Sequence, residues 1–301
     1  MISLEEYISV GSRRTRVVVT GAGNPVVFEA GAGEWSAHWS LVTAAIGNRF
    51  QCIAYDRAGL GLSEPASGSR SAAVLAEELI QVLDELKIGK PAILVAHSFG
   101  ASVSRLAVNM APERFCGIVF VDGWHESFDV WERQNISNLA SNSSKLINLA
   151  ERFGIFRTIN RLWNLVSPPV CPWPLPAEIW ASILAISNSA KFAATTSSEA
   201  SAYEMGDIEV AAVTNLKVPV VNLVASRTIS PEQVPPDYPV DAHNLAWCIS
   251  SSKLSNLSSN SVTKILDDTD HMVQLACPQE VVKAIVQLER MIQKHRVVGH
   301  T

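Results

Sequence analysis

The order of apolar and polar positions divides the chain into short strands and longer helices. Short apolar runs bounded by Gly, Asn and Pro predict strands at residues 7–10, 15–20 and 26–30. We expect these three strands to form an antiparallel first part of a sheet. Further strands are then expected at 50–56, 91–97 and 115–122, and they alternate with helical patterns such as that of residues 71–89. This alternation is typical of parallel strands joined by crossover helices.

The alternation stops between Trp124 and Asn215. Apolar residues there recur at helical spacing, around Leu146 to Phe156 and again around Ile179 to Leu184. The stretch SPPVCPWPLP separates the two patterns, and its five prolines cannot lie inside a helix. The simplest interpretation is a helical cap inserted between two strands of one sheet.

After the interruption, strands are expected at 218–226 and 261–268, and the last helix has one apolar face that includes Val281 and Ile285. The Ser/Asn-rich stretch 250–261 and the tail after His295 are predicted to be loosely structured. We therefore predict an α/β protein with a mostly parallel sheet flanked by helices. Its core domain comprises residues 1–123 and 216–301, and its cap comprises residues 124–215.

Composition narrows the class of protein. A chain of 301 residues that is 48% hydrophobic can bury one large core. A formal net charge of -5, with Lys and Arg scattered, leaves no basic surface for nucleic acid. Five cysteines without metal-ligand spacing are expected to be buried in a reducing compartment. The acidic Glu5 and Glu6 and the lack of a long apolar run predict no signal peptide, no membrane span and a cytoplasmic location.

One serine stands where a buried strand meets a helix. In the stretch VAHSFG, Ser98 follows the strand 91–97 and precedes the small residues Gly100, Ala101 and Ser102. Ligands of open α/β sheets bind at the carboxyl ends of the strands. A tight strand-to-helix turn would present the hydroxyl of Ser98 as a nucleophile at a helix N-terminus. The alternative is an ordinary serine that caps the helix.

Two further polar residues follow predicted strands. His271 follows the last strand, and an imidazole has the pKa that suits a base for a serine nucleophile. Asp122 ends the strand 115–122 and could hold that imidazole in the right tautomer. The alternatives are a surface histidine and an aspartate that terminates a strand. The order Ser98, Asp122, His271 is that of nucleophile, acid and base in α/β hydrolases.

Four segments of the sequence resemble the α/β-hydrolase superfamily. They are FEAGAGEW, similar to the oxyanion loop; YDRAGLGLSE, similar to the D-x-x-G-x-G-x-S turn; AHSFGA, similar to the nucleophile elbow; and DHMVQLACPQEVV, similar to the histidine loop. The resemblance covers almost the whole chain outside the cap and implies the α/β-hydrolase fold. It also implies that Ser98 is the nucleophile, His271 the base, and the backbone N–H groups of Ala32 and Phe99 the oxyanion donors.

The sequence departs from the family pattern at two places. Ala96 stands where the elbow usually has glycine, a change of one methyl group. Many relatives carry the acid after the strand here at 218–226, but that strand is followed by RTISPEQ. Asp122 matches an alternative acid position of the superfamily and is favoured over Glu232 or Asp237.

Other acidic residues are less favoured as the acid. Asp267, Asp268 and Asp270 share the histidine's own loop and would have to fold back toward it. Asp56 and Arg57, in the DRAG turn, are expected to form a buried structural pair that braces this loop.

A serine at the elbow narrows the chemistry, because the dehalogenases and epoxide hydrolases of the superfamily use aspartate there. Acyl transfer on an ester, thioester, lactone or amide remains, through an acyl-serine intermediate and without a metal or organic cofactor. One alternative is carbon-carbon bond hydrolysis or cofactor-free lyase or cyclase chemistry, with His271 as a base on carbon. Another is a non-enzymatic small-molecule receptor on a hydrolase scaffold.

Aromatic residues near the predicted site indicate an apolar small-molecule substrate. Trp35 and Trp124 are predicted to face it, because they lie beside the oxyanion loop and the acid in the sequence. The others are expected to pack the cap against the sheet, although an exposed cap face could instead dock on a membrane or a subunit. These remaining side chains are His38, His125, Phe128, Trp163, Trp173 and Trp180.

Overall fold

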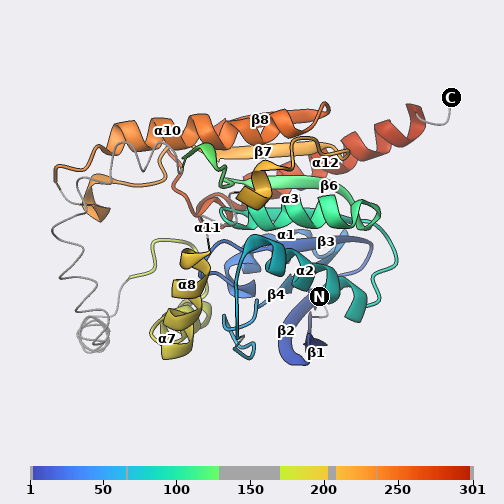
Figure 1. Cartoon of the computed structure of the whole chain (residues 1–301), viewed down its shortest axis with the longest axis horizontal. Helices are drawn as coiled ribbons and strands as arrows, with labels where there is room; N and C mark the ends of the chain where they lie inside the picture. Colours follow the sequence, from blue (N-terminus) through green and yellow to red (C-terminus); the bar gives the residue numbers. More distant parts are fainter. Residues whose placement is uncertain (1–2, 66, 129–169, 203–207, 235, 299–301) are drawn as a thin grey trace.

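The fold is built around one twisted sheet of eight strands (Figure 1). The computed structural model describes residues 3–65, 67–128, 170–202, 208–234 and 236–298. Across the sheet the strands lie in the order β1 (Ser3–Val10), β2 (Arg13–Thr20), β4 (Phe50–Tyr55), β3 (Asn24–Glu29), β5 (Ala92–His97), β6 (Phe115–Val121), β7 (Val220–Ala225) and β8 (Ser261–Leu266).

Strands β1 and β2 form a hairpin whose two turn residues, Gly11 and Ser12, both have positive φ. Strand β2 pairs antiparallel with β4, and the pairs from β4 to β8 are all parallel. The prediction that β3 belongs to the antiparallel part was therefore wrong. Strand β3 is followed by helix α1 (Ser40–Ile46), which forms a crossover long enough to return the chain in parallel.

Helices cover both faces of the sheet. Helices α2 (Ala72–Glu85) and α3 (Gly100–Met110) pack on one apolar cluster, and α1, α11 (Val273–Ala276) and α12 (Pro278–Val298) pack on the other. Helix α2 begins after Ser71, and the chain leaves it through Lys87, which has a φ of 54°. These helices and strands confirm the predicted α/β class and the mostly parallel sheet.

The stretch 250–261 is ordered, contrary to the prediction. It contains the end of α10 (Val240–Ser252) and the short helix η4 (Lys253–Leu257). Leu254 and Leu257 belong to the core cluster on the side of α2 and α3, and Ser258 Oγ donates to the Val218 carbonyl at 2.8 Å. Two buried leucines thus outweigh the polar composition of the segment. Helix α12 likewise continues past His295 to Val298.

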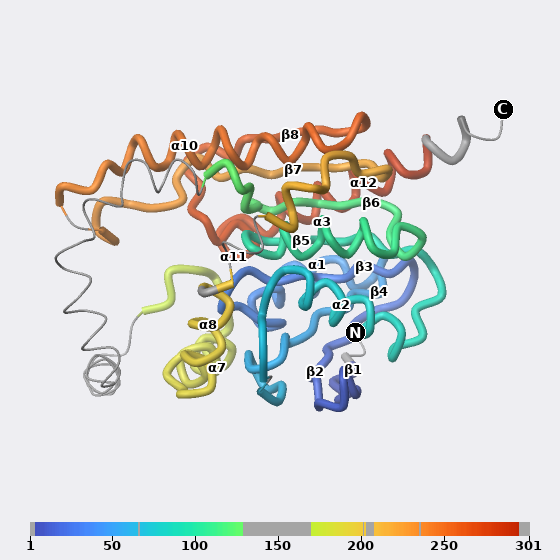
Figure 2. The backbone as a smooth tube through the Cα atoms, viewed as in Figure 1, coloured from blue at the N-terminus to red at the C-terminus, as the bar shows by residue number. Residues whose placement is uncertain are grey.

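The region assigned to the cap contains helices α7 (Ala177–Ser187) and α8 (Ala190–Ser201), which lie together at one end of the sheet (Figure 2). The predicted helical pattern around Leu146 to Phe156 lies outside the described residues. The limits of the cap at 124 and 215 therefore stay a prediction.

All five cysteines have free thiols. Cys52 is buried, and the other four are half-buried. The expectation that all are buried was wrong: Cys116 lies near the start of β6, Cys248 lies on α10, and Cys171 and Cys277 lie between elements, where each keeps part of its surface exposed. Within the described ranges, no helix is long and apolar enough to cross a membrane.

Candidate active site

Ser98 lies on a sharp turn between β5 and α3. Its φ of 49° is left-handed, a strained value for a residue with a side chain. The turn needs glycine at position 100, because a Cβ there would lie 2.7 Å from the Glu29 carbonyl oxygen. The Ser98 N–H donates to Val121 O at 3.2 Å, and Ser98 O accepts from Trp124 N at 2.9 Å. The serine is therefore held at the carboxyl edge of the sheet.

The three predicted triad residues form one hydrogen-bonded chain at this edge. Ser98 Oγ lies 3.0 Å from His271 Nε2, and His271 Nδ1 lies 2.6 Å from Asp122 Oδ2. Asp122 follows β6 and is fully buried, whereas 27% of the His271 side chain is exposed. With the proton on Nδ1, the imidazole donates to Asp122 and its Nε2 can accept the hydroxyl proton of Ser98.

The second carboxylate oxygen of Asp122 has its own donors. Its Oδ1 accepts from Trp247 Nε1 and from Ala225 N, each at 2.9 Å. The Trp247 ring also packs edge-on against His271, with centroids 5.0 Å apart. The competing candidates Glu232 and Asp237 are exposed. Trp247 was missed by the sequence analysis, because nothing in the pattern of α10 links it to a residue 125 positions away.

We expect Trp247→Phe to lower kcat/KM for ester hydrolysis by about tenfold to a hundredfold, since a hydrogen bond to a charged group contributes about 1.5–3 kcal/mol. The phenylalanine keeps an aromatic ring beside His271 but leaves Asp122 one donor short. Trp39→Phe is the matched control, because Trp39 Nε1 is buried without a hydrogen-bond partner among the described residues. Equal losses in the two variants would contradict a positioning role for Trp247.

A buried ion pair lies behind His271. His97 Nδ1 contacts the Glu34 carboxylate at 2.9 Å, and His97 Nε2 lies 2.8 Å from the backbone oxygen of His271. Gln274 Nε2 also donates to Glu34, at 3.2 Å. Burial alone would lower the pKa of His97, but the Glu34 carboxylate outweighs it and raises that pKa. Burial would likewise raise the pKa of Glu34, yet His97 holds it at about 2. The protonated His97 can therefore donate to the histidine loop.

Glu34→Gln is expected to remove much of the acid dependence of the free energy of unfolding. The pKa of Glu34 is lowered from 4.5 to about 2, so its ionised form stabilises the folded state above pH 4.5. That contribution, about 3 kcal/mol, is lost as the pH falls from 4.5 toward 2. Urea unfolding across this pH range measures it. Glu85→Gln, an exposed change on α2, should keep the wild-type slope, and an unchanged slope in Glu34→Gln would refute the prediction.

The predicted oxyanion donors are Phe99, at the start of α3, and Ala32, in the segment after β3. Phe99 follows the serine and is buried, whereas Ala32 follows β3 and is exposed. The Ala32 N–H donates no hydrogen bond to another group within the described part of the chain. Ala96, the departure from glycine, is fully buried in the core cluster and accommodates its methyl group there.

A buried charge network holds the segment after β3, where the oxyanion loop is predicted. Arg57 Nη1 donates to Glu29 at 2.8 Å and to Ala30 O at 2.6 Å, and its Nη2 donates to Gly31 O at 2.6 Å. On its other side Arg57 donates to both carboxylate oxygens of Glu199 at 3.0 Å. All three charged side chains are at most 1% exposed. Burial raises the pKa of Glu29, and Arg57 opposes that rise.

Glu199 connects this network to helix α8. Besides binding Arg57, its Oε2 accepts from the Gly33 N–H at 3.3 Å. Asp56 does not share the network: its Oδ1 accepts from Ser36 N and Oγ, and its Oδ2 accepts from Leu62 N. The expected Asp56–Arg57 pair was therefore wrong: the two side chains are both buried but bind different partners, Arg57 the backbone after β3 and Asp56 the residues Ser36 and Leu62. Glu199 was missed because a single acidic residue in a helix carries no sequence signal.

The two tryptophans predicted to face substrate lie in different surroundings. Trp35 is 2% exposed and packs against Leu60 and Ile183. Trp124 packs edge-on against Phe128 and Trp247, with centroids 5.6 and 5.7 Å apart. Trp247 is the member of this aromatic group that contacts His271.

The other aromatic candidates are distributed around the site. Phe128 also packs against His243. Burial, together with the nearby His271, lowers the pKa of His243 to about 4. Burial lowers the pKa of His125 to about 4 and also lowers that of His38. Trp173 and Trp180 pack on each other, with centroids 6.0 Å apart, and Trp163 lies outside the described residues.

The mostly parallel sheet and the serine on its strand-to-helix turn define an α/β hydrolase arrangement. The sequence model of the alpha/beta hydrolase fold family matches residues 24–204. The chain therefore belongs to the α/β hydrolase fold family, as the resemblance implied.

Comparisons with individual proteins extend this assignment. The chain is 33% identical over 106 residues to a protein of Azorhizobium caulinodans that is named as a carbamate hydrolase, RutD. This alignment covers 35% of this chain and 40% of that protein. The chain is also 27% identical over 119 residues to a cis-3-alkyl-4-alkyloxetan-2-one decarboxylase of Shewanella oneidensis. That alignment covers 38% of this chain and 37% of the decarboxylase. The match thus spans about two fifths of each relative.

Among solved structures, the epoxide hydrolase CorEH superposes with a TM-score of 0.68. The superposition covers 95% of this chain and 98% of that chain, at 17% sequence identity. At this identity the likeness shows the fold alone, so the chemistry has to be argued from the residues of the site.

Proposed function

We propose that this protein is a serine hydrolase that cleaves an ester, thioester or lactone of an apolar small molecule. The observation that carries the proposal is the chain of hydrogen bonds from Ser98 Oγ through His271 to Asp122, at 3.0 and 2.6 Å. Membership of the α/β hydrolase fold family supports it. The serine at the elbow also separates this protein from the aspartate-dependent epoxide hydrolases of the superfamily.

In the proposed reaction, Ser98 Oγ attacks the carbonyl carbon while His271 Nε2 takes the hydroxyl proton. The carbonyl oxygen becomes an oxyanion that accepts from the N–H groups of Ala32 and Phe99. The intermediate collapses to an acyl-serine, and the leaving alcohol or thiol receives the proton from His271. Water, deprotonated by His271, then attacks the acyl-serine and releases the acid. Asp122 orients the imidazole and stabilises its cation throughout.

Substrate selection is assigned to the surroundings of the triad. We propose that residues 124–215 form a cap over the site and that Trp124, beside His271, contacts an apolar acyl or alcohol group. The aromatic packing of Trp124 with Phe128 and Trp247 supports this role. Trp35 is proposed to shape the oxyanion loop rather than to contact substrate at the triad, because it packs against Leu60 and Ile183.

A fluorophosphonate probe tests the nucleophile directly. We expect intact-mass spectrometry to show one adduct on the wild type and none on Ser98→Ala, and we expect hydrolysis of a medium-chain nitrophenyl ester to fall by at least about 10⁴-fold. Ser102→Ala is the matched control: this serine lies four residues further on, in α3, and should keep both properties. A folded wild type that forms no adduct would overturn the proposal and favour the small-molecule receptor.

A second candidate is cofactor-free decarboxylation of a lactone. It is favoured by the local similarity to the oxetanone decarboxylase, whose named substrate is a four-membered lactone with two alkyl groups. Incubation with a dialkyl oxetanone separates the two reactions, because hydrolysis yields a hydroxy acid and decarboxylation yields an alkene and carbon dioxide. Accumulation of the hydroxy acid is the result expected from the proposed function.

A further inference from the structure

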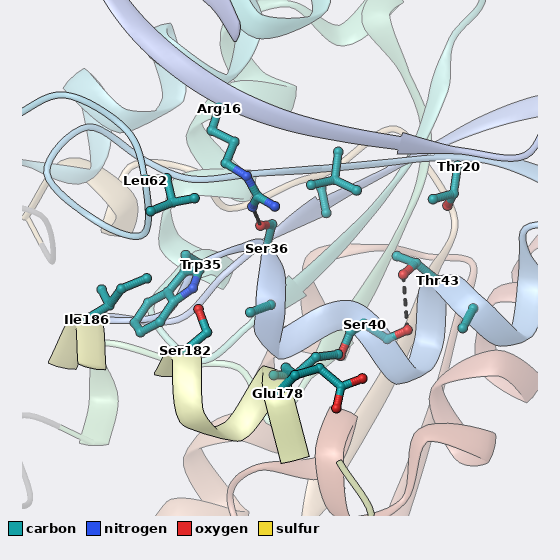
Figure 3. Close-up of a pocket in the computed structure, with 15 residues that line it drawn as sticks. Arg16, Thr20, Trp35, Ser36, Ser40, Thr43, Leu62, Glu178, Ser182 and Ile186 are labelled. Atoms are coloured by element: carbon teal, nitrogen blue, oxygen red, sulfur yellow. Dashed lines mark hydrogen bonds between the residues drawn. The ribbon is translucent and has the colours of Figure 1, made fainter. Parts of the chain in front are cut away.

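A cavity of about 480 Å³ lies between β2, α1 and α7 (Figure 3). Its volume falls within the range of sites that bind small organic molecules. Arg16 and Val18 on β2 form one wall, and Ile179, Ser182 and Ile186 on α7 form the opposite wall. None of the proposed triad residues is among the described residues that line it, so it is separate from the hydrogen-bonded chain at Ser98.

The cavity exists because small side chains face α7 from the core. Ala37, Ser40 and Ala44 lie at helical spacing along η1 (Ser36–Trp39) and α1, and all three line the space. Such short side chains cannot fill the gap between the sheet and α7. Trp35 closes one side with its ring, and Leu62 lines the cavity although half of its surface is exposed. The lining is therefore mainly apolar.

Polar groups occupy defined positions in this apolar space. Arg16 points toward Ser36, to which its Nη1 donates at 2.8 Å (Figure 3). Its Nε donates to Glu5 at 2.7 Å, and Asp56 lies 3.5 Å from Nη1. Ser40 Oγ is buried and has no hydrogen-bond partner among the described residues.

The charges around the cavity define the class of ligand. Two carboxylates already compensate Arg16, and Glu178 on α7 adds a third negative charge to the lining. A carboxylate or phosphate ligand would meet this excess of negative charge. A neutral carbonyl or hydroxyl group would instead find donors on Arg16 and a hydrogen-bond partner in Ser40.

We propose that this cavity is a second small-molecule site, separate from the triad, that binds a neutral and mainly apolar compound carrying a carbonyl or hydroxyl group. The polar group lies toward Arg16 and Ser40, and the apolar body lies against Val18, Ile179 and Ile186. Because α7 and the core each form a wall, the bound compound bridges the two.

Binding of Prodan, a neutral naphthalene ketone whose fluorescence shifts to the blue in apolar surroundings, tests the site. We expect saturable binding to the full-length wild type. Ser182→Phe, which fills the cavity from α7, should weaken it by at least about tenfold. Ala185→Phe is the matched control, since Ala185 is exposed on the same helix and does not line the cavity. An anionic naphthalene sulfonate should not compete for the site.

The same titration on fluorophosphonate-treated protein and on Ser98→Ala separates this site from the proposed active site. Unchanged Prodan binding in both, with loss in Ser182→Phe alone, supports a second site whether or not Ser98 proves to be a nucleophile. Equal affinity in Ser182→Phe and Ala185→Phe would overturn the proposal. Loss of binding after fluorophosphonate treatment would also overturn it, because the probe would then occupy the triad.

Discussion

Asp122→Asn should lower kcat for ester hydrolysis by about 10⁴-fold while leaving the protein folded. The amide has nearly the same shape as the carboxylate, but its NH₂ group can donate to His271 Nδ1 and so favour the tautomer with the proton on Nε2. That tautomer cannot accept the proton of Ser98. His271 Nδ1 lies 2.6 Å from Asp122 Oδ2, so an amide nitrogen in place of that oxygen would contact Nδ1 directly. Steady-state kinetics on the purified variant measure the loss.

Two matched variants decide among the acids that the sequence left open. Glu232→Gln and Asp237→Asn change exposed side chains, and both should retain wild-type kcat. A large loss in either of these, together with an active Asp122→Asn, would assign the acid to the loop after β7 and refute the proposed role of Asp122.

Arg57→Leu is expected to cost at least about 3–5 kcal/mol of unfolding free energy, because it leaves Glu29 and Glu199 buried without their cation. It also removes the bonds from Arg57 to the carbonyls of Ala30 and Gly31, which hold the proposed oxyanion loop. Activity should therefore fall even in the folded fraction. Guanidinium unfolding and kcat measured on the same preparation separate the two effects.

The pH dependence of this variant follows from the same charges. Without Arg57, which opposes the effect of burial, the pKa of Glu29 in the folded state rises further above its value in the unfolded state. A raised carboxyl pKa favours folding at low pH, and that advantage is lost as the pH rises. The difference in unfolding free energy between Arg57→Leu and the wild type should therefore become smaller as the pH is lowered from about 8 to about 5. Arg114→Leu is the matched control, because Arg114 forms an ion pair with the exposed Asp84. It should lower the free energy of unfolding by at most about 1 kcal/mol at every pH.

Local sequence patterns predicted most of the framework. Strand-forming apolar runs and the helix after Ser71 are short-range features, so their positions followed from periodicity alone. The direction of β3 did not follow, because parallel or antiparallel pairing depends on partners distant in the chain. The ordered stretch 250–261 was also missed, since two leucines buried by the rest of the fold decide its conformation.

The sequence by itself determined the α/β class and the candidates Ser98, Asp122 and His271, because each of these residues lies at or shortly after the end of a recognisable strand. Only the tertiary structure decided that they lie within hydrogen-bond distance, and only it revealed Trp247 beside Asp122 and Glu199 beside Arg57. These two partners are 125 and 142 residues from the groups they bind. Such contacts depend on how helices pack across the sheet, and no local pattern of residues encodes that packing.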